Sequence, residues 1–144
     1  TPLLASAKRK ETDIALAMLD IDHFKSINDT YGHDIGDVVL KALGETLTSA
    51  LRATDVVARM GGEEFVIITP DISADKLPEF LDKIRVRISE LSFEAEGKSF
   101  SITASFGAIN YPVDNLEEMI RLADEALYES KNSGRDRVTI TGTA

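Results

Sequence analysis

The first strong pattern along the chain is a continuous apolar run, residues 14–19, that ends in the acidic sequence Asp20-Ile21-Asp22. A short apolar run without alternation is typical of a strand that is buried on both faces. A short helix is predicted to follow, with Asp22 as its N-cap and Gly32 as its left-handed end. The pattern therefore places two carboxylates where a buried strand gives way to a helix.

Helical spacing continues beyond this point. The apolar side chains of the short helix share one side, and Lys25 and Asn28 share another. A longer amphipathic helix is predicted from residue 34 to about residue 52. Its inward-facing positions are Val39, Leu43, Leu47 and Leu51.

Two runs rich in β-forming residues, 55–60 and 63–69, are joined by Gly61-Gly62. Two glycines between apolar runs indicate a hairpin, because the primed turns that suit hairpins need positive φ. Glycine also lacks a side chain, so a ligand could approach the backbone closely here.

The second half of the chain predicts a helix over 76–91 and a strand over 99–109 that pairs with the short run around Phe93. A last helix begins after Pro112 and ends at Gly134; Asp114 is its predicted N-cap, and Glu117 stands in the capping-box position. A strand over 137–141 closes the chain.

The predicted element order is β-α-α-β-β-α-β-α-β, without a repeat or linker, so residues 1–144 read as one domain. Its fold class is α+β: a βαββαβ core with an added helix and strand. Such a chain forms an antiparallel or mixed sheet with helices on one face. No Gly-x-Gly-x-x-Gly or Gly-Lys-Ser/Thr loop is present, so neither a dinucleotide fold nor a P-loop is supported.

Composition narrows the function classes. Hydrophobic residues make up 43% of the chain, enough to bury a core, and there is no cysteine for a disulfide or thiolate metal site. The formal net charge of −9 disfavours nucleic acid and anionic lipid as partners. No apolar run approaches the roughly 20 residues of a membrane span. We expect a cytoplasmic domain without nucleic-acid or direct membrane contact, free or as the cytoplasmic part of a membrane-anchored sensor.

Three groups could carry chemistry, and each has an ordinary reading. Asp20 and Asp22 could bind a cation, or they could be a solvated strand end and a helix cap. Glu63 and Glu64 at the hairpin could simply be solvated. If the hairpin and the strand that ends at Asp20 are neighbours in the sheet, Glu63 and Asp20 could instead bind one Mg²⁺ ion. Mg²⁺ is usually bound by a few protein carboxylates together with substrate phosphates.

The third group is Lys131 and Arg135 at the end of the last helix. Cations are expected there because they complement the helix dipole. They could instead hold the distal phosphates of a nucleotide. A chain of net charge −9 needs such local cations, or metal ions, to bind any phosphate ligand.

Together these segments resemble the GGDEF family of diguanylate cyclases over residues 13–140. Five ordered motifs carry the resemblance, and the first and third are specific to the family. They are LDIDHFKSIND (19–29), YGHDIGD (31–37), RMGGEEF (59–65), ASFGA (104–108), and ADEALYESK (123–131) with GRDR (134–137).

The resemblance implies a palm-like sheet flanked by helices, similar to nucleotide cyclases and ferredoxin-like folds. It implies that Asp20, Glu63 and the Ile21 carbonyl bind Mg²⁺ or Mn²⁺, two ions per half-site. Asn28 and Asp37 would read guanine. The other implied substrate contacts are Phe24, His33, Gly61, Gly62, Lys131 and Arg135, with Lys25 stabilising charge in the transition state.

The implied reaction condenses two GTP into cyclic di-GMP and two pyrophosphates. The 3′-hydroxyl of one GTP attacks the α-phosphorus of the other; Glu63 or Glu64 is the base, and sequence does not separate them. Each domain binds one GTP, so turnover should require a homodimer with the active site at its interface. We expect an upstream input domain to control that pairing.

Arg52-x-x-Asp55 matches the family's product-inhibition site, where cyclic di-GMP would bind. Its ordinary reading is a helix-terminal arginine and a strand-leading aspartate. An arginine there could stack on and fork to a guanine.

The chain departs from the family pattern in two places. Its hairpin reads Gly-Gly-Glu-Glu-Phe, which keeps a carboxylate at the third position. The family's Asp-x-Leu-Thr-Gly-Leu segment is absent, so we expect an N-terminally truncated domain in which residues 1–11 end the helix that would follow it.

The alternatives to a diguanylate cyclase are a non-catalytic module that senses GTP or cyclic di-GMP and an adenylate-cyclase-like enzyme. The retained hairpin carboxylates disfavour the first, and Asn28 with Asp37 disfavours the second.

Overall fold

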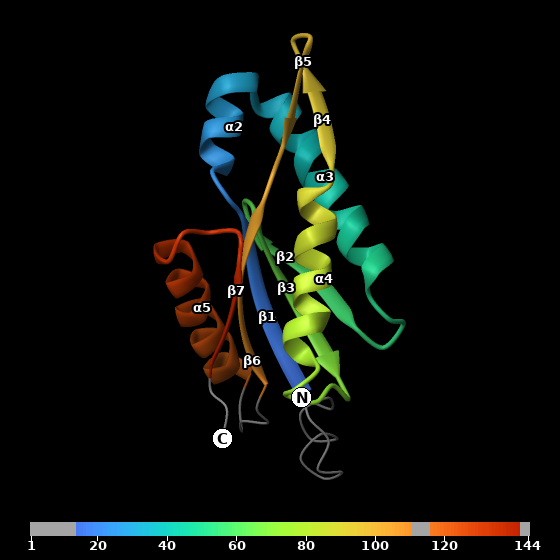
Figure 1. Ribbon diagram of the computed structural model, residues 1–144, viewed down its shortest axis with the longest axis vertical. Helices are drawn as coiled ribbons and strands as arrows, with labels where there is room; N and C mark the ends of the chain where they lie inside the picture. Colours follow the sequence, from blue (N-terminus) through green and yellow to red (C-terminus); the bar gives the residue numbers. More distant parts are fainter. Residues whose placement is uncertain (1–13, 111–115, 142–144) are drawn as a thin grey trace.

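The computed structural model describes residues 14–110 and 116–141 (Figure 1). A mixed sheet has the order β2-β3-β1-β6-β7, in which β6 and β7 are parallel and the other pairs antiparallel. A second sheet consists of β4 and β5. The elements are β1 (Ile14–Ile21), α2 (Phe24–Tyr31), α3 (His33–Ala50), β2 (Val56–Gly61), β3 (Glu64–Pro70), α4 (Leu77–Ser89), β4 (Ser92–Ala95), β5 (Lys98–Ser101), β6 (Ala104–Asn110), α5 (Leu116–Asn132) and β7 (Val138–Thr141).

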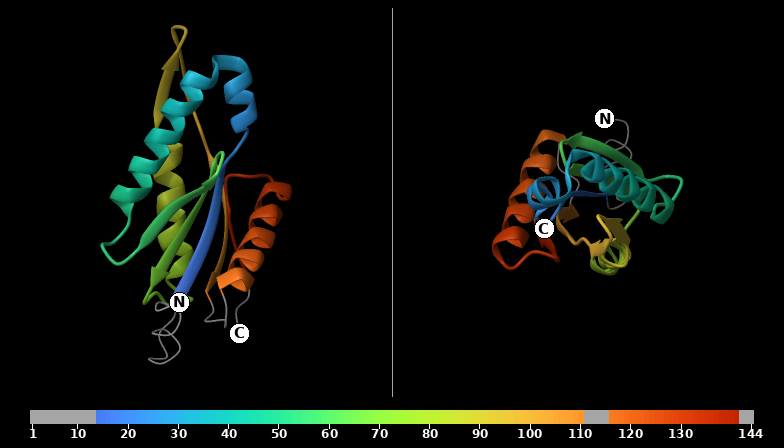
Figure 2. Two further views of the ribbon diagram at one scale, coloured as in Figure 1. Left: turned by 180° about the vertical axis from the view of Figure 1, so that it is seen from behind. Right: turned by 90° about the horizontal axis from the view of Figure 1, so that it is seen from above.

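The central strand β1 is buried along its whole length, as its apolar run predicts. Alternate residues point to opposite faces of a sheet. Ala17 and Leu19 join the larger core with α3 and α4, whereas Leu16 and Met18 join a smaller core with α5. Figure 2 shows α5 on one side of the sheet and α3 and α4 on the other. The α+β class and the flanked sheet are thus confirmed.

The expectation that the helices share one face is wrong. The cause is the unit β6-α5-β7: because β7 is parallel to β6, the chain must return to the other end of the sheet, and α5 makes that return across the face opposite α3 and α4.

The predicted N-cap at Asp22 is also wrong. β1 runs on through Ile21, and His23 precedes α2 with φ 58° and no capping side chain. The carboxylate of Asp22 instead accepts hydrogen bonds from Thr103 and Ser105, across the sheet. Gly32 does end α2 with a positive φ of 93°, but its ψ of 160° is not left-handed helical.

The predicted strand over 99–109 is two strands. β5 pairs with β4, where Phe93 faces Phe100, and β6 joins the main sheet. The pairing with the run around Phe93 is therefore confirmed, although the continuous strand is not. The predicted cap at Asp114 and the helix end over residues 1–11 lie outside the described residues.

The hairpin of β2 and β3 forms as predicted, but its turn differs. Neither Gly61 nor Gly62 is among the residues with positive φ, so the primed turn is wrong. The register shifts between Arg59 and Gly61, and Arg59 Nε donates to the Gly62 carbonyl at 2.8 Å. A Cβ atom at either glycine would meet no atom within 4 Å. The glycines therefore leave open space at the hairpin tip.

Within the residues that the structure describes, none of the helices combines the length and apolarity needed to cross a membrane.

Candidate active site

The carboxyl end of β1 brings Asp20 beside the hairpin tip. β1 and β3 are neighbours, with Asp20 opposite Glu64, so Glu63 at the turn lies one residue from this pair. Burial raises the pKa of Asp20; the Lys131 ammonium opposes that shift, and the negative charges of Glu63 and Asp22 add to it. The condition set in the sequence analysis, that the first strand and the hairpin are neighbours in the sheet, is met.

Lys131 reaches this cluster from the last turn of α5. Its Nζ lies 2.6 Å from Asp20 Oδ2, and the two side chains are 34% and 11% exposed. The helix approaches the sheet closely because β6 carries Gly107 at the contact: a Cβ there would lie 2.0 Å from the backbone nitrogen of Leu127. A cation thus already neutralises the buried carboxylate.

Glu64 lies partly buried among other acidic side chains. Burial raises the pKa of Glu64, and the negative charges of Asp124 and Asp20 raise it further, against the opposing effect of Lys131. A carboxylate whose proton affinity is raised is better suited to accept a proton. Both side chains are half-buried at the mouth of the site.

The donor set fits a hard divalent cation that keeps other ligands. Among the described residues, no group of three or more acidic, histidine or cysteine side chains could hold a metal ion by itself. Mg²⁺ is usually bound by one or two carboxylates together with substrate phosphates rather than by a full protein cage. Asp20 near the end of β1 and Glu63 in the turn before β3 supply such a set at an open hairpin tip.

A second cluster lies between α2 and α3. The Oδ1 atom of Asn28 is buried and has no hydrogen-bond partner among residues 14–110 and 116–141, although buried polar atoms normally find one. Gly36 makes room for it, since a Cβ there would lie 1.9 Å from this oxygen. Asp37 follows Gly36 and is exposed, as is His33, whereas Phe24 belongs to the core. This amide oxygen is a buried acceptor whose hydrogen-bonding capacity is unused within the described residues.

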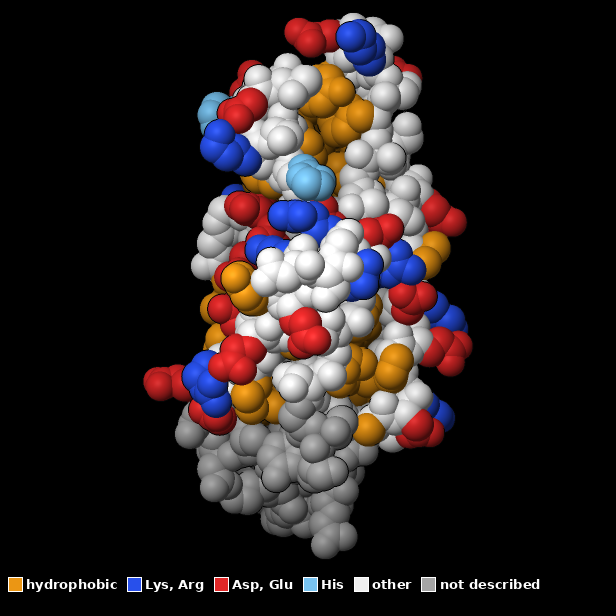
Figure 3. All heavy atoms as spheres, turned by 60° about the vertical axis from the view of Figure 1, so that its left-hand side comes forward, with side chains coloured by type: hydrophobic (Ala, Val, Ile, Leu, Met, Phe, Trp, Pro, Cys, Tyr) orange, Lys and Arg blue, Asp and Glu red, His pale blue; other side chains and the backbone are white. Residues whose placement is uncertain are grey.

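The remaining predicted cations are more exposed. The Lys25 side chain is 89% exposed and forms an ion pair with Asp29 at 2.9 Å. Arg135 lies beyond α5, where its backbone N–H donates to the Ser130 carbonyl at 2.9 Å. Figure 3 shows acidic and basic side chains gathered midway up this face, between α2 above and α5 below. The structure joins Lys131 to Asp20 directly and leaves Lys25 at the surface.

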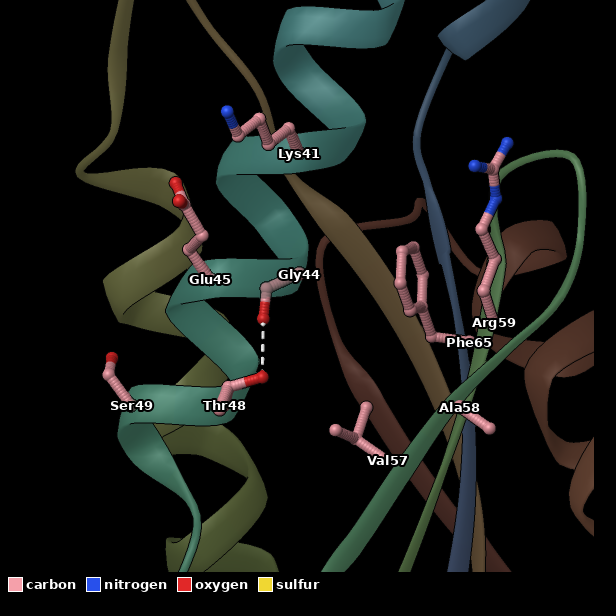
Figure 4. Close-up of a pocket in the computed structure, with 9 residues that line it drawn as sticks. All are labelled: Lys41, Gly44, Glu45, Thr48, Ser49, Val57, Ala58, Arg59 and Phe65. Atoms are coloured by element: carbon pink, nitrogen blue, oxygen red, sulfur yellow. Dashed lines mark hydrogen bonds between the residues drawn. The ribbon is translucent and has the colours of Figure 1, made fainter.

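A groove of about 520 Å³ between α3 and β2 was not predicted (Figure 4). Lys41 lies on its α3 side, and Arg59 and Phe65 lie on its sheet side, next to the hairpin. None of the side chains predicted to contact a nucleotide lines it. The motif RMGGEEF contains both Arg59 and Phe65, so it was the sequence feature that could have indicated this groove.

Arg52 and Asp55 form a compact unit at the far end of the sheet. The guanidinium donates to Asp55, to Thr69 Oγ1 at 2.6 Å and to the Pro70 carbonyl at 2.6 Å. Burial would raise the pKa of Asp55, but hydrogen bonds from Arg52 and Thr69 outweigh it, and the pKa is lowered. An open groove of about 610 Å³ adjoins Arg52 and contains Lys76 and Lys83. Arg52 and Asp55 thus lie beside a groove of mixed charge, because Asp71 and Glu79 also line it.

Several known proteins are similar to this chain in sequence and fold. A family model described as "Diguanylate cyclase, GGDEF domain" matches residues 1–137. Diguanylate cyclase A of Treponema denticola is 40% identical over 139 residues, which are 95% of this chain and 37% of that protein. The chain therefore spans little more than a third of that relative.

Two solved structures are also similar. The GGDEF domain of DgcB from Caulobacter crescentus, in complex with c-di-GMP, is 37% identical with a TM-score of 0.90; the match covers 96% of this chain and 84% of that one. The active GGEEF domain of a diguanylate cyclase from Vibrio cholerae is 31% identical with a TM-score of 0.89, covering 99% and 92%.

Proposed function

Because the chain belongs to the GGDEF family of diguanylate cyclase domains, we propose that it condenses two GTP molecules into cyclic di-GMP and two pyrophosphates. The observation that carries the proposal is the convergence of Asp20, the hairpin glutamates and Lys131 at one end of the sheet. The hairpin Gly-Gly-Glu-Glu-Phe occurs by name in the active Vibrio cholerae domain. A glutamate at the third position is therefore compatible with activity in this family.

In this proposal Asp20, Glu63 and the Ile21 carbonyl hold Mg²⁺ or Mn²⁺, two ions per half-site. When bound, the ions would act as Lewis acids that neutralise charge on the phosphates. Lys131 and Arg135 bind the distal phosphates, and Lys25 stabilises charge from the exposed side. We infer that Glu64, whose pKa is raised, takes the proton of the 3′-hydroxyl, and that Glu63 is the alternative base.

Substrate selection would rest on the cluster between α2 and α3. The buried Asn28 Oδ1 is an acceptor without a donor. Guanine carries N–H donors on the edge by which a protein would recognise it. The exposed Asp37 carboxylate can accept from the same edge. Phe24 and His33 would line this nucleotide site, and the open space at Gly61 and Gly62 would admit the sugar and phosphates.

The product has two-fold symmetry and each domain supplies one half-site, so turnover requires a homodimer. The test is incubation of the chain with GTP and Mg²⁺, with products separated by chromatography, at several protein concentrations and with a fused coiled coil that forces pairing. Specific activity should rise with concentration and be highest in the fusion. Absence of cyclic di-GMP from the fusion would refute the catalytic proposal, and retained GTP binding would then favour a sensing module.

Arg52 and Asp55 are proposed to bind cyclic di-GMP as an inhibitor. Arg52→Ala should weaken cyclic di-GMP binding about tenfold or more, because a charge-assisted hydrogen bond contributes roughly 1.5–3 kcal/mol. Titration calorimetry measures the affinity. Arg121→Ala, on the exposed face of α5, is the matched control and should bind normally. Equal affinity of Arg52→Ala and the control would show that the product binds elsewhere.

A further inference from the structure

Asp22 is a buried carboxylate to which the proposed reaction gives no role. It follows β1 directly and is only 6% exposed. Its backbone N–H donates to the Thr103 carbonyl at 2.9 Å. A buried carboxylate is costly unless donors compensate it, so its partners indicate what it does.

Three donors surround this carboxylate. Ser105 Oγ lies 2.6 Å from Oδ1, and Thr103 Oγ1 lies 2.7 Å from Oδ2. The third donor is the backbone N–H of Asp136, 3.0 Å from Oδ2 and 114 residues away in the sequence. Asp22 thus connects the end of β1, the start of β6 and the loop between α5 and β7.

That loop has an unusual backbone. Gly134, Arg135 and Asp136 have consecutive φ values of 121°, 63° and 47°. Left-handed backbone is sterically unfavourable for residues other than glycine, and it persists only where the surroundings hold it. The Asp136 N–H bond to Asp22 holds the main chain, and Arg85 Nη1 holds the Asp136 side chain at 2.6 Å. Arg135 therefore stands on a segment anchored on both sides.

We propose that Asp22 is a positioning residue: by fixing the Asp136 N–H it holds the loop in the conformation that aims Arg135 at the distal phosphates of the substrate. The inference rests on the proposed function. A positioning role differs from a simple packing role, because loss of a packing contact would weaken binding of every part of the nucleotide alike. Loss of the anchor should instead weaken the grip on phosphate selectively.

The test compares binding of 3′-deoxy-GTP and 3′-deoxy-GMP to the whole chain in Mg²⁺, by titration calorimetry. Neither nucleotide has the attacking hydroxyl, so no turnover interferes. Asp22→Ala should raise the dissociation constant of 3′-deoxy-GTP about tenfold and that of 3′-deoxy-GMP less than about twofold. Asp22→Asn, which keeps one acceptor oxygen, should lie between it and the wild type and remains informative if the alanine variant does not fold.

The matched control is the double variant Thr103→Val/Ser105→Ala. It removes two donors from Asp22 but leaves the Asp136 contact, so it should lower thermal stability and keep the affinity for 3′-deoxy-GTP. Equal losses for both nucleotides, or no loss in either Asp22 variant, would overturn the positioning role. Equal affinity of the unaltered chain for the two nucleotides would instead overturn the phosphate contacts in the proposed function.

Discussion

Glu63→Gln should reduce cyclic di-GMP formation by about 10³-fold or more while leaving the domain folded. Removal of one group that stabilises charge in the transition state or transfers a proton costs roughly 10²–10⁴-fold in enzymes, and Glu63 is proposed to bind metal and is also a candidate base. Stability should not fall, because Glu63 raises the pKa of the buried Asp20 by repulsion and glutamine removes that repulsion.

Initial rates with GTP and Mg²⁺, together with a thermal melt, measure both effects. Glu94→Gln, an exposed glutamate on β4 far along the chain from the hairpin, is the control and should keep full activity. Glu64→Gln then separates the two candidate bases: a loss of rate without a loss of metal affinity would assign proton transfer to Glu64. A Glu63→Gln variant with more than a tenth of the normal rate would contradict the proposed metal site.

Gly107→Ala should be the most destabilising glycine-to-alanine substitution among the described residues. The new Cβ would lie 2.0 Å from the Leu127 nitrogen and 2.3 Å from the Ala123 carbonyl oxygen, and both are backbone atoms that cannot rotate away. Overpacking in a core costs about 1–3 kcal/mol, and more where backbone must move, so we expect a loss of about 3 kcal/mol or more.

Urea unfolding measures this free energy. Gly44→Ala is the matched control, because the same methyl group there meets no atom within 4 Å and lies inside α3. It should stabilise the domain by about 0.5–1 kcal/mol, the helix-propensity advantage of alanine over glycine. Equal effects of the two substitutions would mean that α5 does not approach β6 as closely as described.

The sequence predicted most of this architecture because its signals are local. The unbroken apolar run at 14–19 indicated a strand buried on both faces, and the two glycines indicated the hairpin. The errors arose where a residue that fits a local pattern instead contacts residues far away in the sequence. Asp22 looks like a helix cap, yet its partners are 81 to 114 residues away.

The sequence also indicated part of the arrangement of the candidate site. The neighbourhood of Asp20 and the hairpin followed from assuming that two strands pair. The contact of Lys131 with Asp20 did not, because it depends on α5 crossing the opposite face at a distance that Gly107 permits. The groove beside Arg59 was missed because only one of its walls contains motif residues, Arg59 and Phe65, and the other wall is a face of α3.

In the proposed function, the sheet that divides the interior into two cores would also separate the residues that contact the two ends of the nucleotide. Residues proposed to read the base stand on α2 and α3, over the larger core, whereas Lys131 stands on α5, over the smaller one. Substitutions at distant sites that share no partners usually have additive effects. Substitutions on α2 and α3 should therefore change base preference nearly independently of substitutions on α5 that change phosphate affinity. The carboxyl end of β1 is where the two groups of residues come together.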